Sequence, residues 1–310
     1  MPAPTASRRS ARRFIAPVLA LLVAVALTAC DGADDPRPIR VGAGSTTEQQ
    51  VLAALTAGLL DRDGHPAEVV PDLGDTTDVR EAALDGDIDV YWDYSGATWA
   101  LALGLTAPPI DAQESYEAVA AEEEGNGLRW LTSSGVDARL AFFVRPEALT
   151  DAEDATLTWL AGELGQVDGA LCADPAFLDA PSGYAYLADT YAIAPDATAT
   201  RGAGEEEALR GTAEGTCIAG MASATSGLAR ELGLVALTDD QGVFPAQVVA
   251  PVVRLDTTVL DDRAERLVGS LSAELTTDAL ADLNAEAQAG TPIDQVAGAF
   301  LDASPLGGGG

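Results

Sequence analysis

The sequence predicts an α/β protein of two domains, each built on a mostly parallel sheet flanked by helices. Strand-like and helix-like segments alternate along both halves of the chain, which is typical of parallel strands connected by helices. Hydrophobic residues make up 47% of the chain. A core can therefore be buried, whereas disordered acidic chains are poor in such residues. The length of 310 residues favours two domains, since one domain typically takes about 100–200 residues.

The first part of the chain predicts the order β-α-β-α-β. Strands are expected at 39–42, 67–70 and 88–92, where short apolar runs end at turn residues. Helices are expected at 49–60 and 75–84, because apolar residues recur there at helical spacing and Thr residues stand near their starts. This order implies a parallel sheet covered by helices.

The rest of the chain continues the alternation. Two short strands are expected at 128–131 and 139–145, and the second is the most β-like run in the sequence. Further strands are expected at 169–173, 217–221, 234–237 and 248–254. Helices are expected at 157–163, 185–191, 205–212, 261–273, 277–287 and 292–301.

The N-terminus is typical of an export signal. Arginines without any acidic residue precede an apolar run of about 16 residues, shorter than the ~20 that a spanning helix needs. The run ends in a Leu-Thr-Ala-Cys sequence similar to a bacterial lipobox, which predicts a lipoprotein signal peptide at 1–29 and a lipid on Cys30. An ordinary secretory signal is the alternative. Residues 30–38 are expected to form a tether, and residues 307–310 a disordered tail.

The charge balance restricts the classes of partner that the chain can bind. The net charge is −32, from 49 acidic and 17 basic residues. Nucleic acid is excluded as a partner because phosphate binding needs clustered Lys and Arg. A basic membrane-binding patch is excluded for the same reason, so we expect the chain to reach the membrane only through the lipid on Cys30.

Two cysteines remain after Cys30, namely Cys172 and Cys217. A pair of cysteines in an exported protein predicts a disulfide, and two buried free thiols are the alternative. Neither cysteine has metal-ligand spacing, and His65 is the single histidine, so no metal site and no cofactor are expected.

No catalytic constellation stands out, and we do not expect an enzyme. His65 lies in a turn beside Pro66, with no Ser or Cys motif near it. The acidic runs at 122–124 and 205–207 are interpreted as solvated helix faces, and no facing carboxylate pair of the glycosidase type can be singled out. A nucleotide-binding ATPase is excluded because the phosphate-binding Gly loop with Lys is missing.

Several segments, taken in order, are similar to one known family. They are the opening strand and helix at 41–49, the Gly turn at 72–76, the stretch at 83–96, the return segment at 237–254 and the final helices at 275–301. The most specific stretch is 83–96. Together they resemble the substrate-binding proteins of ABC importers for glycine betaine, choline and related osmolytes, over residues 39–306.

The resemblance implies a two-lobed type II periplasmic-binding-protein fold. Lobe 1 is expected at 39–138 and 250–306, and lobe 2 at 139–249. The two lobes of this family close on a ligand in the cleft between them. The implied partners are a small-molecule solute and an ABC permease with its ATPase. A monomer anchored at the outer face of the bacterial cytoplasmic membrane is expected.

The chain departs from the family at several expected ligand contacts. Members that bind quaternary ammonium compounds use a cage of aromatic rings. Here Gly44 and Thr46 stand where the family has a lysine and an aromatic, and Ala180 stands where it has an arginine. Arg139 is the new cation near the cleft and is a candidate for binding a carboxylate. A salt bridge with an acidic neighbour is the alternative.

The ligand-binding residues are therefore predicted from position in the family pattern. Tyr94 and Ser95 are favoured because they follow a strand that should end in the cleft, and the alternative for each aromatic ring is packing against the sheet. The predicted set is Ser45, Thr46, Thr47, Tyr94, Ser95, Arg139, Tyr184, Tyr191, Ser223 and Thr225.

The predicted function is capture of a small quaternary-ammonium or zwitterionic solute, glycine betaine-like or choline-like, and its delivery to a permease. The substituted cage positions favour a related zwitterion or polar amine over simple glycine betaine. The alternative is a lipid-anchored sensor or scaffold that kept the fold but changed its ligand or lost its transport role.

Overall fold

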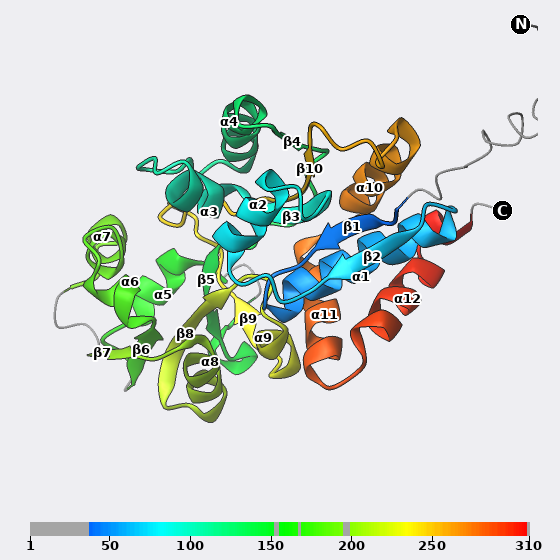
Figure 1. The fold of residues 1–310 in the computed structure, drawn as a ribbon. Helices are drawn as coiled ribbons and strands as arrows, with labels where there is room; N and C mark the ends of the chain where they lie inside the picture. Colours follow the sequence, from blue (N-terminus) through cyan, green and yellow to red (C-terminus); the bar gives the residue numbers. More distant parts are fainter. Residues whose placement is uncertain (1–36, 152–154, 167–168, 195–198, 309–310) are drawn as a thin grey trace, which may run out of the picture. The chain divides into compact units, whose positions relative to one another are not determined.

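Figure 1 shows the computed structural model, which describes residues 37–151, 155–166, 169–194 and 199–308. The predicted signal peptide, Cys30 and most of the tether lie outside these residues. The described strands form two five-stranded sheets. We call each sheet, together with the helices packed on it, the first and the second lobe.

The first sheet has the strand order β2-β1-β3-β10-β4. β1 is parallel to β2 and β3, whereas β10 is antiparallel to β3 and β4. One strand therefore runs against the other four. The strand bounds are β1 (Ile39–Gly42), β2 (Ala67–Val70), β3 (Val90–Tyr94), β4 (Leu128–Trp130) and β10 (Val249–Arg254).

The second sheet has the order β7-β6-β8-β5-β9. β6 is parallel to β7 and β8, and β5 is antiparallel to β8 and β9. The prediction of mostly parallel sheets is confirmed in both lobes. The strand bounds are β5 (Leu140–Val144), β6 (Ala170–Ala173), β7 (Ala199–Gly202), β8 (Cys217–Ser223) and β9 (Val235–Ala236).

Helices pack on both sheets (Figure 1). In the first lobe they are α1 (Thr47–Arg62), α2 (Thr76–Leu84), α3 (Ser95–Ala97), α4 (Ala112–Gly125), α10 (Asp262–Glu274), α11 (Thr277–Gln288) and α12 (Ile293–Ala303), with a π-helix at Thr98–Ala102. In the second lobe they are α5 (Leu157–Glu163), α6 (Pro175–Asp179), α7 (Tyr184–Thr190), α8 (Glu205–Glu214) and α9 (Gly227–Glu231). Among the described residues, no helix is long and apolar enough to cross a membrane.

The sequence explains where the longer helices begin. The Thr46 hydroxyl accepts a hydrogen bond from the Gln49 amide at the start of α1, and Thr276 does the same for α11. Asp75 forms a capping box with Asp78 at the start of α2. The long apolar face of α1, including Leu52 and Leu55, is fully buried, which anchors this helix against the first sheet.

Local predictions differ from the structure at β3 and at elements that were not predicted, among them α4, α6, α9 and β7. β3 was expected at 88–92 but continues to Tyr94, because its antiparallel pairing with β10 reaches that residue. The helix α4 was not predicted. Its buried face consists of Ser115, Val119 and Glu123, so the apolar periodicity that normally indicates a helix is weak there.

Glu123 also corrects the interpretation of the acidic run at 122–124. Its side chain is fully buried rather than solvated. Both of its oxygens accept hydrogen bonds from the Arg80 guanidinium, at 2.8 and 2.9 Å. This bidentate ion pair joins α2 to α4 beneath the surface of the first lobe.

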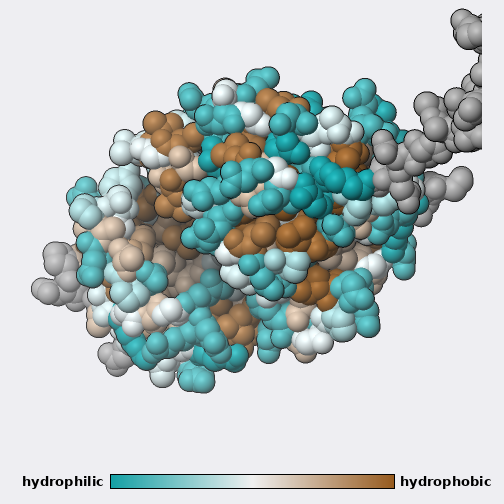
Figure 2. Space-filling view, in the orientation of Figure 1, coloured by the Kyte–Doolittle hydropathy of each residue, from teal (hydrophilic) through white to brown (hydrophobic). Residues whose placement is uncertain are grey.

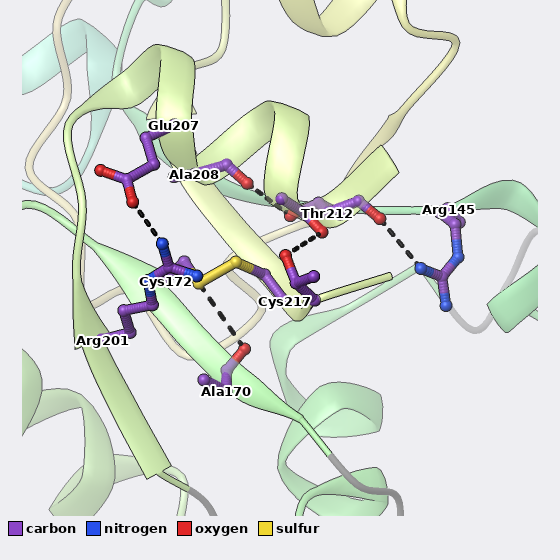
Figure 3. Close-up of a disulfide and its surroundings, with 10 residues drawn as sticks. Arg145, Ala170, Cys172, Arg201, Glu207, Ala208, Thr212 and Cys217 are labelled. Atoms are coloured by element: carbon purple, nitrogen blue, oxygen red, sulfur yellow. Dashed lines mark hydrogen bonds and ion pairs between the residues drawn. A yellow bond between two sulfur atoms is a disulfide. The ribbon is translucent and has the colours of Figure 1, made fainter. Parts of the chain in front are cut away.

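Cys172 and Cys217 form a disulfide that joins β6 to β8 in the second lobe (Figure 3). Both cysteines are buried. Near the bridge, Thr212 donates its hydroxyl proton to the Ala208 carbonyl, and its own carbonyl accepts from Arg145. The bridge lies within one sheet, so it stiffens the second lobe without linking it to the first.

The chain passes between the lobes twice, from β4 to β5 and again from β9 to β10. The two connecting segments lie side by side, since Asp137 and Val248 form an isolated antiparallel bridge. The Ala138 amide donates to the Gln247 carbonyl at 2.9 Å. Paired segments of this kind can act as a hinge between two bodies.

The face drawn in Figure 2 is mostly hydrophilic, in keeping with the acidic composition, and hydrophobic residues gather there in separate patches. Within the described part of the chain, the most exposed large hydrophobic side chain is Leu101, at 67%, in the π-helix that follows α3. Leu105 and Ile110, which follow it in the chain, are exposed as well, and some exposed large hydrophobic side chains are ordinary for a folded protein.

Candidate functional site

A cavity of about 370 Å³ lies between elements of the two lobes. Its volume suits a small organic molecule. The cavity is lined by Ser45, Thr46, Thr47, Glu48, Gln49, Asp75, Thr76, Tyr94, Glu205, Ser223, Thr225, Ser226, Gly227, Asn284 and Gln288.

The loop after β1 and the first turn of α1 form one wall. Thr46 both caps α1 and donates its hydroxyl proton to the Gln49 side-chain oxygen at 3.0 Å. Gly44 lies just before them. A Cβ at Gly44 would come within 2.3 Å of the Gln49 oxygen and 2.7 Å of the Gly74 carbonyl. The close approach of these two loops therefore requires glycine at this position.

Glu48 links this wall to two other parts of the molecule. One of its oxygens accepts from the Tyr94 hydroxyl at 2.7 Å, at the end of β3. The other accepts from the Asn284 amide at 2.8 Å, on α11. The same amide donates to the Thr225 carbonyl at 3.0 Å, in the second lobe. Asn284 thus bridges the two lobes at the cavity.

The second-lobe wall is formed by the end of β8, the turn that follows it and the start of α8. Ser223 donates to the Ala138 carbonyl at 3.1 Å, and its oxygen lies 2.9 Å from the Thr225 hydroxyl. Ser226 caps α9 and donates to the Glu205 carboxylate at 2.7 Å. These bonds fix the hydroxyls of this wall in position.

The lobes touch where α9 meets α11. A Cβ at Gly227 would lie 2.5 Å from the Ala285 nitrogen and 2.6 Å from the Asn284 carbonyl carbon, so only glycine permits this approach. Beside it, the Arg230 guanidinium pairs with the Asp282 carboxylate, at 2.5 and 3.1 Å. This contact closes one side of the cavity.

The cavity is acidic. Among the residues that the structure describes, the charged ones that line it are Glu48, Asp75 and Glu205, with no arginine, lysine or histidine. None of the ion pairs found within the described ranges involves these three residues. Burial raises the pKa of Tyr94 well above its usual value, and the neighbouring Glu48 charge adds to the effect. The Tyr94 hydroxyl therefore stays protonated and donates to Glu48.

The structure brings six of the predicted ligand-binding residues together and places the other four elsewhere. Ser45, Thr46, Thr47, Tyr94, Ser223 and Thr225 line the cavity. Ser95 is fully buried, and its hydroxyl is engaged with the Ser115 hydroxyl and the Val248 amide, at 2.7 and 3.0 Å. Ser95 thereby holds the second connecting segment against the first lobe.

Arg139 lies at the lobe crossing and lines a different depression. Its guanidinium pairs with Asp137, at 2.6 and 2.8 Å, and donates to the Ile110 and Phe244 carbonyls. The alternative of a salt bridge with an acidic neighbour is the arrangement observed. With its donors directed at Asp137 and two carbonyls, Arg139 fixes the crossing segments.

The two predicted tyrosines of the second lobe belong to its core region. Tyr191 is buried in the apolar cluster and donates to the Asp239 carboxylate at 2.5 Å. Burial and that carboxylate raise the pKa of Tyr191 strongly. Tyr184 packs on the same cluster. Tyr94 is consequently the one aromatic residue among the described residues that line the cavity.

Three polar residues of the lining were not predicted from the sequence, namely Glu48, Asn284 and Glu205. Glu48 and Asn284 stand inside segments that were recognised as similar to the family, but neither was singled out as a contact. Glu205 belongs to the run at 205–207, interpreted as a solvated face. A carboxylate in the first turn of a helix that follows a strand was the available signal, because such turns lie at the sheet edge where ligands bind.

No group of His, Cys, Asp and Glu within the described ranges could hold a metal ion.

Two α/β lobes joined by paired segments, with a small-molecule cavity between them, define a two-lobed binding protein. Residues 37–303 match the family model described as the substrate-binding domain of the ABC-type glycine betaine transport system. The chain belongs to this family. It is the substrate-binding protein of an ABC importer and not an enzyme. Such proteins work outside the cytoplasm and serve a permease.

Individual relatives agree with this assignment. A glycine betaine-binding protein of Escherichia coli, YehZ, is 29% identical over 276 residues, which cover 85% of this chain and 90% of the relative. A glycine-betaine-binding protein of Pseudomonas aeruginosa is 26% identical over 244 residues, or 74% of this chain and 78% of that protein.

Solved structures show the same architecture. The structure of apo YehZ from E. coli superposes with a TM-score of 0.75 at 27% identity, covering 87% of this chain and 99% of that one. A structure described as a glycine betaine/carnitine/choline ABC transporter gives a TM-score of 0.79 at 21% identity and covers 86% and 99% of the two chains. The predicted two-lobed fold is confirmed.

Proposed function

We propose that the cavity between the lobes is the solute site. We also propose that the solute is a small amine-derived cation or zwitterion, of the chemical class that includes betaine, choline and carnitine. The main support for this proposal is the cavity, because its walls come from both lobes and its described charged lining residues are all acidic. An acidic wall attracts a positively charged nitrogen. The two glycine betaine-binding relatives, and a carnitine transport binding protein of Listeria monocytogenes that is also similar to this chain, support the same class.

The position of Asn284 suggests how solute binding is coupled to closure of the lobes. Its amide bonds Glu48 of the first lobe and the Thr225 carbonyl of the second. A solute held between these walls contacts both lobes only when they are closed. It therefore favours the closed form by its differential affinity, and the closed form is the one delivered to the permease.

The proposed contacts are those predicted residues that line the cavity, together with the acidic residues and Asn284. Arg139, Ser95, Tyr184 and Tyr191 are proposed as structural residues instead. Each is engaged with the protein itself or packed in the second-lobe core, as described above.

Isothermal titration calorimetry of the purified protein with betaine, choline, carnitine and less methylated amines tests the proposal. At least one is expected to bind and to raise the thermal midpoint by mass action. Asn284→Ala is expected to weaken that binding roughly tenfold. Asn126→Ala is the matched control, since Asn126 also donates to a glutamate, Glu123, outside the cavity. Equal affinities in both variants would contradict the assignment of the cavity.

We further propose that Cys30 carries a lipid and that the chain acts as a monomer. The Leu-Thr-Ala-Cys sequence supports the first point, and the single-chain cavity supports the second. In cell fractionation, the native protein is expected with the membranes and Cys30→Ser in the soluble fraction. Light scattering after size exclusion should give the mass of one chain.

A further inference from the structure

Most side-chain hydroxyls on the first-lobe wall donate their proton to acceptors within the protein. Ser45 donates to the Gly74 carbonyl at 3.3 Å, Thr46 to the Gln49 oxygen at 3.0 Å and Tyr94 to Glu48 at 2.7 Å. Each of these hydroxyls has one proton. What they still offer a solute is the lone pairs of their oxygens.

The second-lobe wall follows the same pattern. Ser223 gives its proton to the Ala138 carbonyl, so in the Ser223–Thr225 contact Thr225 is the donor. Ser226 gives its proton to Glu205. Asn284 directs its amide at Glu48 and at the Thr225 carbonyl, and both of these groups only accept. This wall, too, presents acceptors.

Among the described lining side chains, the donors outside these bonds are the hydroxyls of Thr47 and Thr76 and the side-chain amides of Gln49 and Gln288. Each of these groups also carries an oxygen that accepts. The lining also contains three carboxylates. Each carboxylate can accept more hydrogen bonds than the bonds described above supply. The described lining is therefore rich in acceptors, poor in donors and negatively charged.

The helix N-termini at the cavity do not offset this imbalance. A helix N-terminus is normally a good site for an anion. At α1 the first turn carries Glu48, at α2 the cap is Asp75, and α8 begins with Glu205. A carboxylate already interacts favourably with each helix dipole, so a carboxylate on the solute would meet like charge.

From this inventory we infer that the site selects a protonated amine that carries N–H donors and no carboxylate, in preference to a quaternary ammonium compound or a zwitterion. An N–H⁺ group can both pair with the carboxylates and bond to the oxygen lone pairs of the walls. A quaternary nitrogen donates nothing and is normally held by several ring faces, whereas Tyr94 is the one ring on this lining. The inference rests on the proposed function of the cavity and narrows its substrate class.

A methylation series tests the inference by calorimetry. Ethanolamine, its N-methyl and N,N-dimethyl derivatives and choline share one hydroxyl and one positive charge, while the N–H donors fall stepwise to none. We expect affinity to fall along the series, with choline roughly tenfold to hundredfold weaker than ethanolamine. Glycine betaine is measured beside them and is expected to bind more weakly than ethanolamine.

Two Glu→Gln variants test whether the acidic lining causes the preference for ethanolamine over choline. Glu48→Gln replaces a charged acceptor by an amide that brings its own donors, so the ratio of ethanolamine affinity to choline affinity is expected to fall towards one. Glu68→Gln makes the same charge change on the exposed edge strand β2 and should leave the ratio unchanged. Thermal midpoints of the unliganded variants show that they are folded.

The outcomes separate the two proposals. Choline or glycine betaine binding as tightly as ethanolamine, or more tightly, overturns this inference and leaves the proposed function standing. A ratio that does not respond to Glu48→Gln overturns the role of the acidic acceptors. Binding of no amine, betaine or carnitine by the native protein overturns both proposals.

Discussion

The two lobes share one strand plan and stabilise it by different means. Read from one edge, the orders β2-β1-β3-β10-β4 and β7-β6-β8-β5-β9 correspond position by position. In each sheet the antiparallel strand, β10 or β5, is the first strand that the chain enters after crossing between the lobes. The direction of entry thus explains why one strand runs against its neighbours in both sheets.

The means of stabilisation differ. The first lobe holds α2 to α4 by the buried pair of Arg80 and Glu123, and it buries Asp93 at the end of β3. In the second lobe, the Cys172–Cys217 disulfide links neighbouring strands. The strand order of a sheet therefore does not dictate which interactions stabilise its lobe. The first lobe is therefore expected to respond to pH and to loss of a charge partner, and the second to reduction.

Loss of the buried ion pair between Arg80 and Glu123 is expected to lower the free energy of unfolding the most. Arg80→Met leaves Glu123 buried without its partner, which typically costs about 3–5 kcal/mol of unfolding free energy. Chemical denaturation measures the loss. A double variant, Arg80→Met with Glu123→Leu, should recover much of it, because no unpaired charge remains. If the single variant is as stable as the native protein, the pair does not fix the first lobe.

Removing the disulfide comes next. The bridge closes a loop of 45 residues in sequence, which corresponds to roughly 2–4 kcal/mol. Cys172→Ser with Cys217→Ser should lower the denaturation midpoint by that amount, and reductant should lower the midpoint of the native protein alone. A native protein that is insensitive to reductant would show that the second lobe does not depend on its bridge.

The pH dependence of the first lobe follows from Asp93. Burial raises the pKa of this carboxyl to about 7 in the folded protein. Between about pH 4 and pH 7 the folded state keeps a proton that the unfolded state has lost. Stability therefore falls as pH rises through this window, by at most about 1.4 kcal/mol per pH unit.

Asp93→Asn isolates this contribution. The amide cannot titrate, so the difference in unfolding free energy between the native protein and the variant should change with pH between 4 and 7 and level off above 7. Denaturation at a series of pH values measures it. A difference that stays constant with pH would exclude Asp93 as the titrating group.

The smallest expected effect concerns the contact between the lobes. Gly227→Ala places a Cβ against the α11 backbone, which opposes closure and is expected to weaken solute affinity about tenfold with little loss of stability. Gly162→Ala in α5 is the matched control, because nothing lies within 4 Å of the added Cβ. If both variants bind the solute equally, the contact between α9 and α11 does not contribute to closure.

The sequence alone predicted the fold class, most strands and the long helices, because apolar periodicity and turn residues are local signals. It named Cys172 and Cys217 as a candidate pair because they are the two cysteines that remain after Cys30 in a chain with an export signal. It failed at α4, whose buried face is largely polar, and at Glu123, whose partner Arg80 lies far along the chain. Burial of a charge is decided by such a partner and not by the residues next to it.

The binding site divides in the same way. Loop positions after β1 and β8 were predicted from the resemblance to the family, and they lie at strand ends, where ligands bind in α/β folds. Only the tertiary structure decided that Glu48 and Asn284, 236 residues apart, are bonded, and that Arg139 is engaged at the crossing. The acceptor to which each hydroxyl donates its proton could not be predicted from the sequence either. Hydrogen bonds act over about 3 Å, so the three-dimensional neighbours of a polar group determine what it can offer a solute.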